Sequence, residues 1–181
     1  MSLTGKWIDL IYRTATGNWK MKIILAPLVG LSFFSLICLF IFLSYLFDRL
    51  LQLPKFPGHP WSVIIGVPII TVGFILMAVS AAYFIKVRGT PVPFSPPPVL
   101  ITGGPYRYAR NPMITGLFIM LFGLGIICNS LTLILIFTPL FISMNYWELK
   151  KVEEPELEKR LGQGYVNYKK RVPMFFPWRK N

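Results

Sequence analysis

The stretch GGPYRYARNPMI, residues 103–114, combines two arginines, two tyrosines and two prolines at the start of a long apolar run. Pro105 and Pro112 prevent one regular helix from crossing it, and Arg107 and Arg110 belong at the water edge while the following residues enter lipid. Irregular polar backbone is tolerated at membrane depth only where protein buries it or where it lines a water-filled site. The stretch therefore predicts a binding pocket at the membrane surface. A basic loop without a ligand is the alternative.

The composition is that of a single-domain integral membrane protein. Of the 181 residues, 54% are hydrophobic and 15% aromatic, above the average for soluble domains. The net charge is +12, but four basic residues precede residue 23, four lie in 86–110, nine follow residue 147, and only Arg49 and Lys55 occupy the remaining loop. This asymmetry predicts that both termini and the 86–110 loop are cytosolic. It favours the bilayer as partner and argues against nucleic acid.

The cysteines and the histidine predict no metal centre. Cys38 and Cys128 are far apart, and His59 is the only histidine. Metal sites and disulfide frameworks are recognised by closely spaced Cys and His residues, which this chain lacks. We assign these three residues no role.

The first half of the chain predicts two membrane-spanning helices after an interfacial segment. Residues 1–22 mix aromatic, aliphatic and basic side chains, which suits a segment lying along an anionic membrane surface. Residues 23–47 and 61–85 carry no charge and are long enough to span. Gly66, Gly73 and Ser80 recur every seventh residue of the second run, which favours close approach by another helix. Five prolines in 91–98 then predict an extended cytosolic loop.

The third apolar run predicts a helical hairpin. The 37 residues between Arg110 and Glu148 carry no charge, and a single helix of that length reaches about 55 Å, against a hydrocarbon core of about 30 Å. Cys128-Asn129-Ser130 is the only polar break, so we expect helices at 112–127 and 131–147 and four spans in total. The short first arm favours substrate access from the bilayer beside it. Gly116 and Gly123 allow close approach there by a neighbouring helix or a lipid tail.

From Glu148 the chain becomes charged, and apolar residues recur at helical spacing. This pattern predicts a cytosolic amphipathic C-terminal helix. We expect Pro155 to kink that helix or to begin its second half, and Gly162 and Gly164 to end it. The fold class is thus an all-α integral membrane protein with three parts: residues 1–22, the helices of 23–85, and the loop, hairpin and C-terminal helix of 86–181.

Two carboxylates, Glu153 and Glu154, come into proximity with the 103–114 loop because both ends of a hairpin return to the same membrane face. Together they are able to hold an ammonium group, while Tyr106 and the loop backbone enclose a planar ring. The alternative is that both glutamates are solvated and pair with Lys150 or Lys151 at helical spacing.

GPYRYARNPM followed, after the apolar hairpin, by EEPELEKRLGQGYVNYKKRVP resembles the family of isoprenylcysteine carboxyl methyltransferases and phospholipid N-methyltransferases, over about residues 90–178. The resemblance implies S-adenosylmethionine as cofactor, with Glu153 in contact with it and Glu154 as partner of Glu153. Asn111 replaces a family histidine and Ile114 a family tyrosine, and Glu148 and Leu149 lie where the prenylcysteine enzymes place an arginine that they use on the substrate. The implied cofactor-binding residues are Val99, Leu100, Ile101, Tyr106, Asn111, Pro112, Met113, Ile114, Glu153 and Glu154.

The leading hypothesis is an integral membrane methyltransferase that uses S-adenosylmethionine on a lipophilic small molecule or lipidated substrate, such as a prenylcysteine carboxylate or a phospholipid amine. Because the sulfonium methyl group is already activated, no catalytic residue is assigned. One alternative is a nicotinamide-dependent membrane reductase, in which Arg107 and Arg110 bind a 2′-phosphate. Another is a non-catalytic membrane scaffold.

Overall fold

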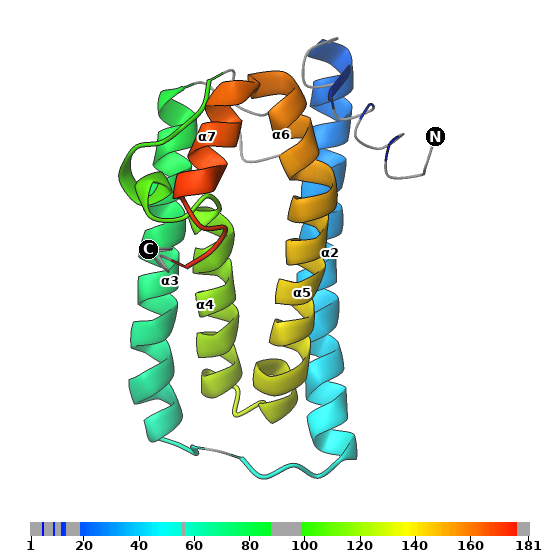
Figure 1. The fold of residues 1–181 in the computed structure, drawn as a ribbon. Coiled ribbons are helices and arrows are strands. Elements are labelled where there is room, and N and C mark those ends of the chain that lie inside the picture. Colours follow the sequence, from blue (N-terminus) through cyan, green and yellow to red (C-terminus); the bar gives the residue numbers. More distant parts are fainter. Residues whose placement is uncertain are drawn as a thin grey trace.

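The computed structural model describes Gly5, Asp9, Tyr12, Arg13 and residues 19–55, 57–87 and 99–176. Within these residues all regular structure is helical, as the sequence predicts (Figure 1). Most of the expected interfacial segment 1–22 and the proline-rich 91–98 stretch lie outside the described residues. The elements are α2 Trp19–Leu50, α3 Trp61–Lys86, the 3-10 helix η1 Gly104–Arg107, α4 Pro112–Ile127, the π-helix η2 Leu133–Phe137, α5 Thr138–Glu148, the π-helix η3 Leu149–Glu153, α6 Glu154–Leu161 and α7 Gln163–Arg171.

Two described helices are long and apolar enough to cross a membrane, namely Pro27–Leu50 within α2 and the whole of α3, Trp61–Lys86. Their large apolar side chains point outward: Leu31 is 66% exposed and Phe34 62%. A soluble protein rarely exposes so contiguous an apolar surface, so the chain is a membrane protein. The α3 bounds lie within one residue of the predicted span. The α2 helix is longer than 23–47 at both ends, because a helix satisfies its own backbone and needs no apolar run to continue.

The third apolar helix, α4, packs backbone to backbone against α3. A Cβ atom on Gly73 would lie 2.6 Å from the carbonyl oxygen of Gly116, and one on Gly123 would lie 3.0 Å from that of Gly66. The glycines that the sequence placed on one face of each helix are thus two halves of a single interface. The sequence predicted either a helix or a lipid tail beside Gly116 and Gly123. The prediction of a helix is confirmed and that of a lipid tail is wrong, because the α3 backbone fills that face.

The hairpin turn falls at residues 128–130, as predicted. Asn129 adopts φ +51°, and its side-chain oxygen accepts a hydrogen bond from the Gly58 amide at 2.8 Å. Asp48 at the end of α2 accepts one from the Thr132 amide at 3.0 Å. The α2–α3 connection and the hairpin turn are therefore joined at the same end of the helix bundle.

Beyond the turn, residues 131–161 form one helical run with π-helical turns at η2 and η3. We expected the hydrophobic arm to end near residue 147 and a separate amphipathic helix to follow from Glu148. Instead, the helix continues through Glu148 without a break. The α5 helix lies beside α2 (Figure 1), with Phe33 and Phe141 ring centroids 5.5 Å apart. Phe118 and Leu121 of α4 and Phe141 of α5 form the buried core cluster.

The C-terminal elements fold back over the 103–114 stretch, which we call the motif loop. Gly162, at φ +60°, ends α6, as glycine permits, but α7 begins at the next residue and contains Gly164, so the prediction that Gly164 ends a helix is wrong. Pro155 lies in the first turn of α6, directly after η3, in agreement with its expected place. After α7 the chain returns along the loop, and the amides of Arg110 and Asn111 donate to the carbonyls of Pro173 and Met174 at 2.9 and 3.0 Å.

Candidate functional site

The motif loop is fixed on α3 by its aromatic residues. Tyr106 is buried, its ring meets Phe84 edge-on at 5.7 Å, and its carbonyl accepts a 2.6 Å hydrogen bond from the Tyr168 hydroxyl. Gly104 has φ +56°, and a Cβ atom there would lie 2.4 Å from the Tyr83 ring. A side chain at position 104 is thus excluded twice, by backbone conformation and by space. The loop is consequently held between α3 and α7.

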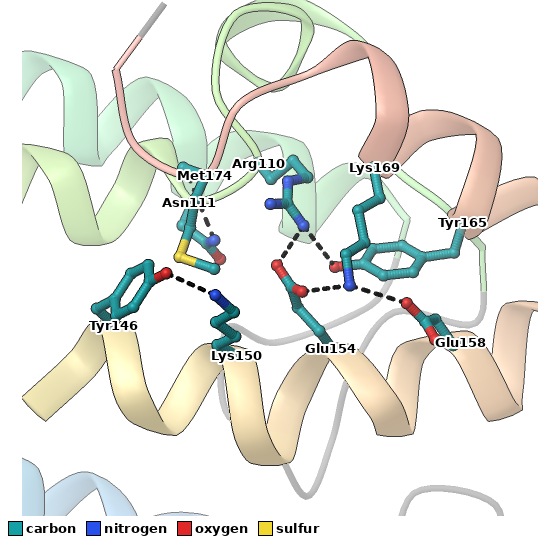
Figure 2. A network of polar contacts seen from close by, with 9 residues as sticks. All are labelled: Arg110, Asn111, Tyr146, Lys150, Glu154, Glu158, Tyr165, Lys169 and Met174. Carbon is teal, nitrogen blue, oxygen red and sulfur yellow. Dashed lines mark hydrogen bonds and ion pairs between the residues drawn. The ribbon is translucent and has the colours of Figure 1, made fainter.

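A buried ion-pair network joins this loop to the C-terminal helices (Figure 2). Arg110 pairs with Glu154, and both side chains are less than a tenth exposed. The second oxygen of Glu154 contacts the Lys169 ammonium at 2.5 Å, and Lys169 also pairs with Glu158 at 2.9 Å. The Tyr165 hydroxyl lies 3.4 Å from Arg110 Nη1. A buried charge is tolerated only with partners of this kind, so Glu154 has a structural reason to be where it is.

The alternative that Glu154 is solvated and pairs with Lys150 or Lys151 is wrong, since its partners come from the loop and from α7. Lys150 donates instead to the Tyr146 hydroxyl at 2.8 Å. In Figure 2 these two residues face Asn111 and Met174 across the space between α5 and the loop.

Two carboxylates stand apart from this network. Of the seven acidic residues, five accept a hydrogen bond or an ion pair, whereas Glu148 and Glu153 bond to no other described side chain. The π-helical turn η3 explains their proximity, because its i to i+5 hydrogen bonding places residues five apart above one another. Burial, then repulsion from Glu148 and Glu156, raises the pKa of Glu153 to about 8. Arg160, which is paired with Glu156, partly offsets this rise by attraction. We call Glu148 and Glu153 the acidic pair.

The remaining predicted site residues are distributed around the loop. Val99 is half-exposed, and Leu100 and Ile101 are partly buried in the extended stretch before η1. The Asn111 side chain donates to the Met174 carbonyl at 3.4 Å. Pro112 is the first residue of α4, and Met113 is the second. Ile114 packs against the Phe118 cluster, which explains why an apolar side chain suits that position.

Several residues of the site were not anticipated from the sequence. The pairing of Pro173 and Met174 with the loop backbone has no side-chain signature. Glu148 was not paired with Glu153, since a five-residue spacing separates them on an ordinary α-helix. The buried tyrosines Tyr165 and Tyr168 did have a signal, because their spacing of three places both on the inner face of a helix.

The structure thus defines a helical membrane protein whose polar end carries a partly buried ion-pair network and an acidic pair. Residues 61–164 match the family model of phospholipid methyltransferase. This match spans more than half of the chain, and the chain belongs to the phospholipid methyltransferase family. It begins at the start of α3 and ends in the first turn of α7. No curated protein and no solved structure matches the chain significantly. The resemblance inferred from the two sequence motifs is confirmed, and the protein is a membrane methyltransferase by family.

Proposed function

We propose that the chain transfers the methyl group of S-adenosylmethionine to a lipophilic acceptor at the cytosolic face of the membrane. The observation that carries this proposal is the burial of Glu153 beside Glu148. Glu153 is desolvated and bonds to no other described side chain, while the adjacent Glu154 is fully engaged. Arg160 attracts Glu153 but is itself paired with Glu156, so an ammonium group, such as the one in the methionine moiety of the cofactor, would complement the Glu153 carboxylate.

Each predicted site residue has a place in this proposal. Glu153 binds the ammonium group, and Glu154 positions the motif loop through Arg110. Tyr106, Val99, Leu100 and Ile101 provide apolar and aromatic walls. Residues 111–114 lie where α4 begins. The bound cofactor supplies an already activated methyl group, so the chain's own residues bind, orient and exclude water.

The acidic pair also bears on the acceptor. Without a ligand the pKa of Glu153 is raised to about 8, so a bound ammonium group would favour its charged form, whereas a second carboxylate nearby would oppose it. An amine must lose a proton before it attacks, and Glu148, whose pKa is raised by burial, would accept that proton. We therefore favour an amine acceptor over a prenylcysteine carboxylate. The reductase alternative is disfavoured because Arg110, one of the two arginines proposed for a 2′-phosphate, is already paired with Glu154.

The proposed topology has four spans, with α4 and the 131–147 arm completing the bundle and both termini in the cytosol. The basic-residue asymmetry supports it. In a chain whose own cysteines are removed, a single cysteine at position 95 is expected to react with an impermeant reagent only from the cytosolic side. Labelling only from outside would contradict both the topology and the cytosolic cofactor site.

Ligand-dependent thermal stabilisation of the detergent-solubilised protein tests the cofactor. S-adenosylmethionine and its demethylated product are expected to raise the melting temperature, because a ligand at about 100 times its Kd stabilises the native state by about 2.7 kcal/mol. NADPH is expected to have no effect. Glu153→Gln should weaken S-adenosylmethionine binding about 10- to 150-fold, whereas Glu158→Gln, on the neighbouring turn of α6, should not. Stabilisation by NADPH alone, or equal affinity in Glu153→Gln, would refute the proposal.

A further inference from the structure

A cavity of about 240 Å³ lies between α3, α4 and the motif loop, and none of its described lining residues belongs to the ion-pair network. Its walls come from Leu76 of α3, Ile119 of α4, Tyr108 and Ala109 of the loop, and Phe175 and Phe176 of the returning C-terminal segment. A dry cavity of about 150 Å³ accommodates benzene. The space is therefore sufficient for several carbon atoms of an aliphatic chain.

The lining offers a polar ligand almost nothing. Of the described lining residues, Thr115 alone has a hydroxyl group away from the rim, and this group donates to the Asn111 carbonyl at 2.9 Å, with the Phe175 carbonyl as a second acceptor at 3.2 Å. The hydroxyl group is thus satisfied within the protein. Among the described residues, no charged side chain lines the cavity. Only an apolar group fits it without leaving a polar atom unpaired.

The cavity is continuous with the surface that meets lipid. Leu76 adjoins Val72, Ile75 and Val79 on α3, which are 59%, 54% and 43% exposed and belong to a membrane-spanning helix. At the other rim, Tyr108 is 61% exposed and Phe176 52%. Aromatic residues in this position are typical of the boundary between hydrocarbon and water. The group that reaches the opening is therefore the hydrocarbon of the surrounding bilayer.

We propose that this cavity is a binding site for one hydrocarbon chain of a membrane lipid, inserted beneath the motif loop at the cytosolic boundary of the bilayer. The inference goes beyond the proposed methyl transfer and does not depend on it. Hydrocarbon gains no hydrophobic free energy by leaving the bilayer, so the preference for the site comes from packing and is modest. The experiment should therefore measure which residues of the protein the lipid contacts, and not its affinity.

The test uses the full-length protein in phosphatidylcholine vesicles that contain phosphatidylcholine with a photoactivatable diazirine on its acyl chain. After irradiation, mass spectrometry maps the labelled residues. We expect residues 105–119 and 175–176 to be labelled severalfold more than the exposed face of α3 around Val72. Equal labelling of both regions, or no label in the cavity, would overturn the proposal, since in the second case another apolar group fills it.

Matched substitutions locate the label. Ile119→Trp fills the cavity from α4 and is expected to reduce labelling of residues 105–119 severalfold, whereas Val72→Trp, on the exposed face of α3, leaves it unchanged. Leu76→Phe fills the cavity from the opposite wall and serves if Ile119→Trp does not fold. If Ile119→Trp or Leu76→Phe folds and labelling of residues 105–119 is unchanged, the proposed lipid site would also be refuted. Cofactor binding, measured separately by calorimetry, distinguishes this failure from a failure of the proposed methyl transfer.

Discussion

The two arms of the helical hairpin are attached to the rest of the protein by different physical means. Helix α4 meets α3 through glycine backbones, with no charge involved. The second arm continues as one helix to Leu161 and is joined to the loop and α7 through the ion pairs of Glu154. Close backbone packing leaves little room for movement, whereas ion pairs respond to ligands and pH. The first arm is therefore the more rigid of the two, and the second carries the carboxylates that we propose as ligand-binding groups.

The largest effect should come from blocking the glycine interface. Gly73→Leu places side-chain atoms where the α4 backbone lies, because the Cβ atom alone would be 2.6 Å from the Gly116 carbonyl oxygen. We expect a loss of more than about 4 kcal/mol, or failure to fold. Thermal unfolding and gel filtration in detergent measure it. Gly30→Leu is the control, since a Cβ atom there meets nothing within 4 Å. Similar behaviour of both variants would mean that α3 and α4 are not in close contact.

Breaking the buried ion pair should have the next largest effect. Arg110→Met leaves Glu154 with Lys169 as its remaining cation, and loss of one partner of a buried pair costs about 3 to 5 kcal/mol. The double variant Arg110→Met, Glu154→Met should recover much of this loss, because it removes both charges. Denaturant unfolding of both variants measures the difference. Arg107→Met, at an exposed position, should change stability by less than about 0.5 kcal/mol. A double variant as unstable as Arg110→Met would contradict the pairing.

The acidic pair predicts a pH-dependent effect of intermediate size. The pKa of Glu153 is raised to about 8, so the native state binds a proton more tightly than the unfolded state. The contribution of Glu153 to stability is full below about pH 4.5 and is lost as pH rises to about 8. Glu153→Gln removes this titration. The cofactor-free variant should therefore gain stability over the native sequence as pH rises from 5 to 8, by about 1 to 2 kcal/mol at pH 8.

Melting temperatures at pH 5 and pH 8, without ligand, measure this difference. Glu158→Gln serves as the comparison because its carboxylate is paired with Lys169. A Glu153→Gln variant that loses stability at pH 8 would show that a cation of the protein, such as Arg160, already holds the carboxylate, which would then not be available for a ligand.

The smallest effect concerns an exposed ion pair. Lys159 lies 2.7 Å from Asp9, but the two side chains are 47% and 33% exposed, and pairs in water contribute about 0 to 1 kcal/mol. Lys159→Met should therefore change the unfolding free energy by less than about 1 kcal/mol, and 1 M salt should remove even that. A loss comparable to that of Arg110→Met would mean that this contact is essential to the bundle.

The helices of the apolar runs were predictable because a bilayer imposes length and hydropathy directly on the sequence. The 112–127 arm has the predicted bounds, and α3 differs from its predicted span by one residue. The proximity of Glu153 and Glu154 to the loop followed from hairpin topology. Their opposite environments did not, because neighbouring residues on a helix point about 100° apart and only the packed structure shows which one meets Arg110. The π-helical turns and the return of Pro173 and Met174 also leave no local pattern in side chains.

The helical run from residue 131 to residue 161 has no break, so a tilt at one end displaces the other end. From the hairpin turn to Glu153 it is roughly 30 Å long at the helical rise. A tilt of about 5° at the turn therefore moves the far end by about 3 Å, comparable to one hydrogen-bond length. Helices tilt when bilayer thickness changes. Because α4 is fixed to α3, such a tilt would alter the separation of Glu153 from the loop, so the acyl-chain length of the host membrane would change the geometry of the site that we propose for the cofactor.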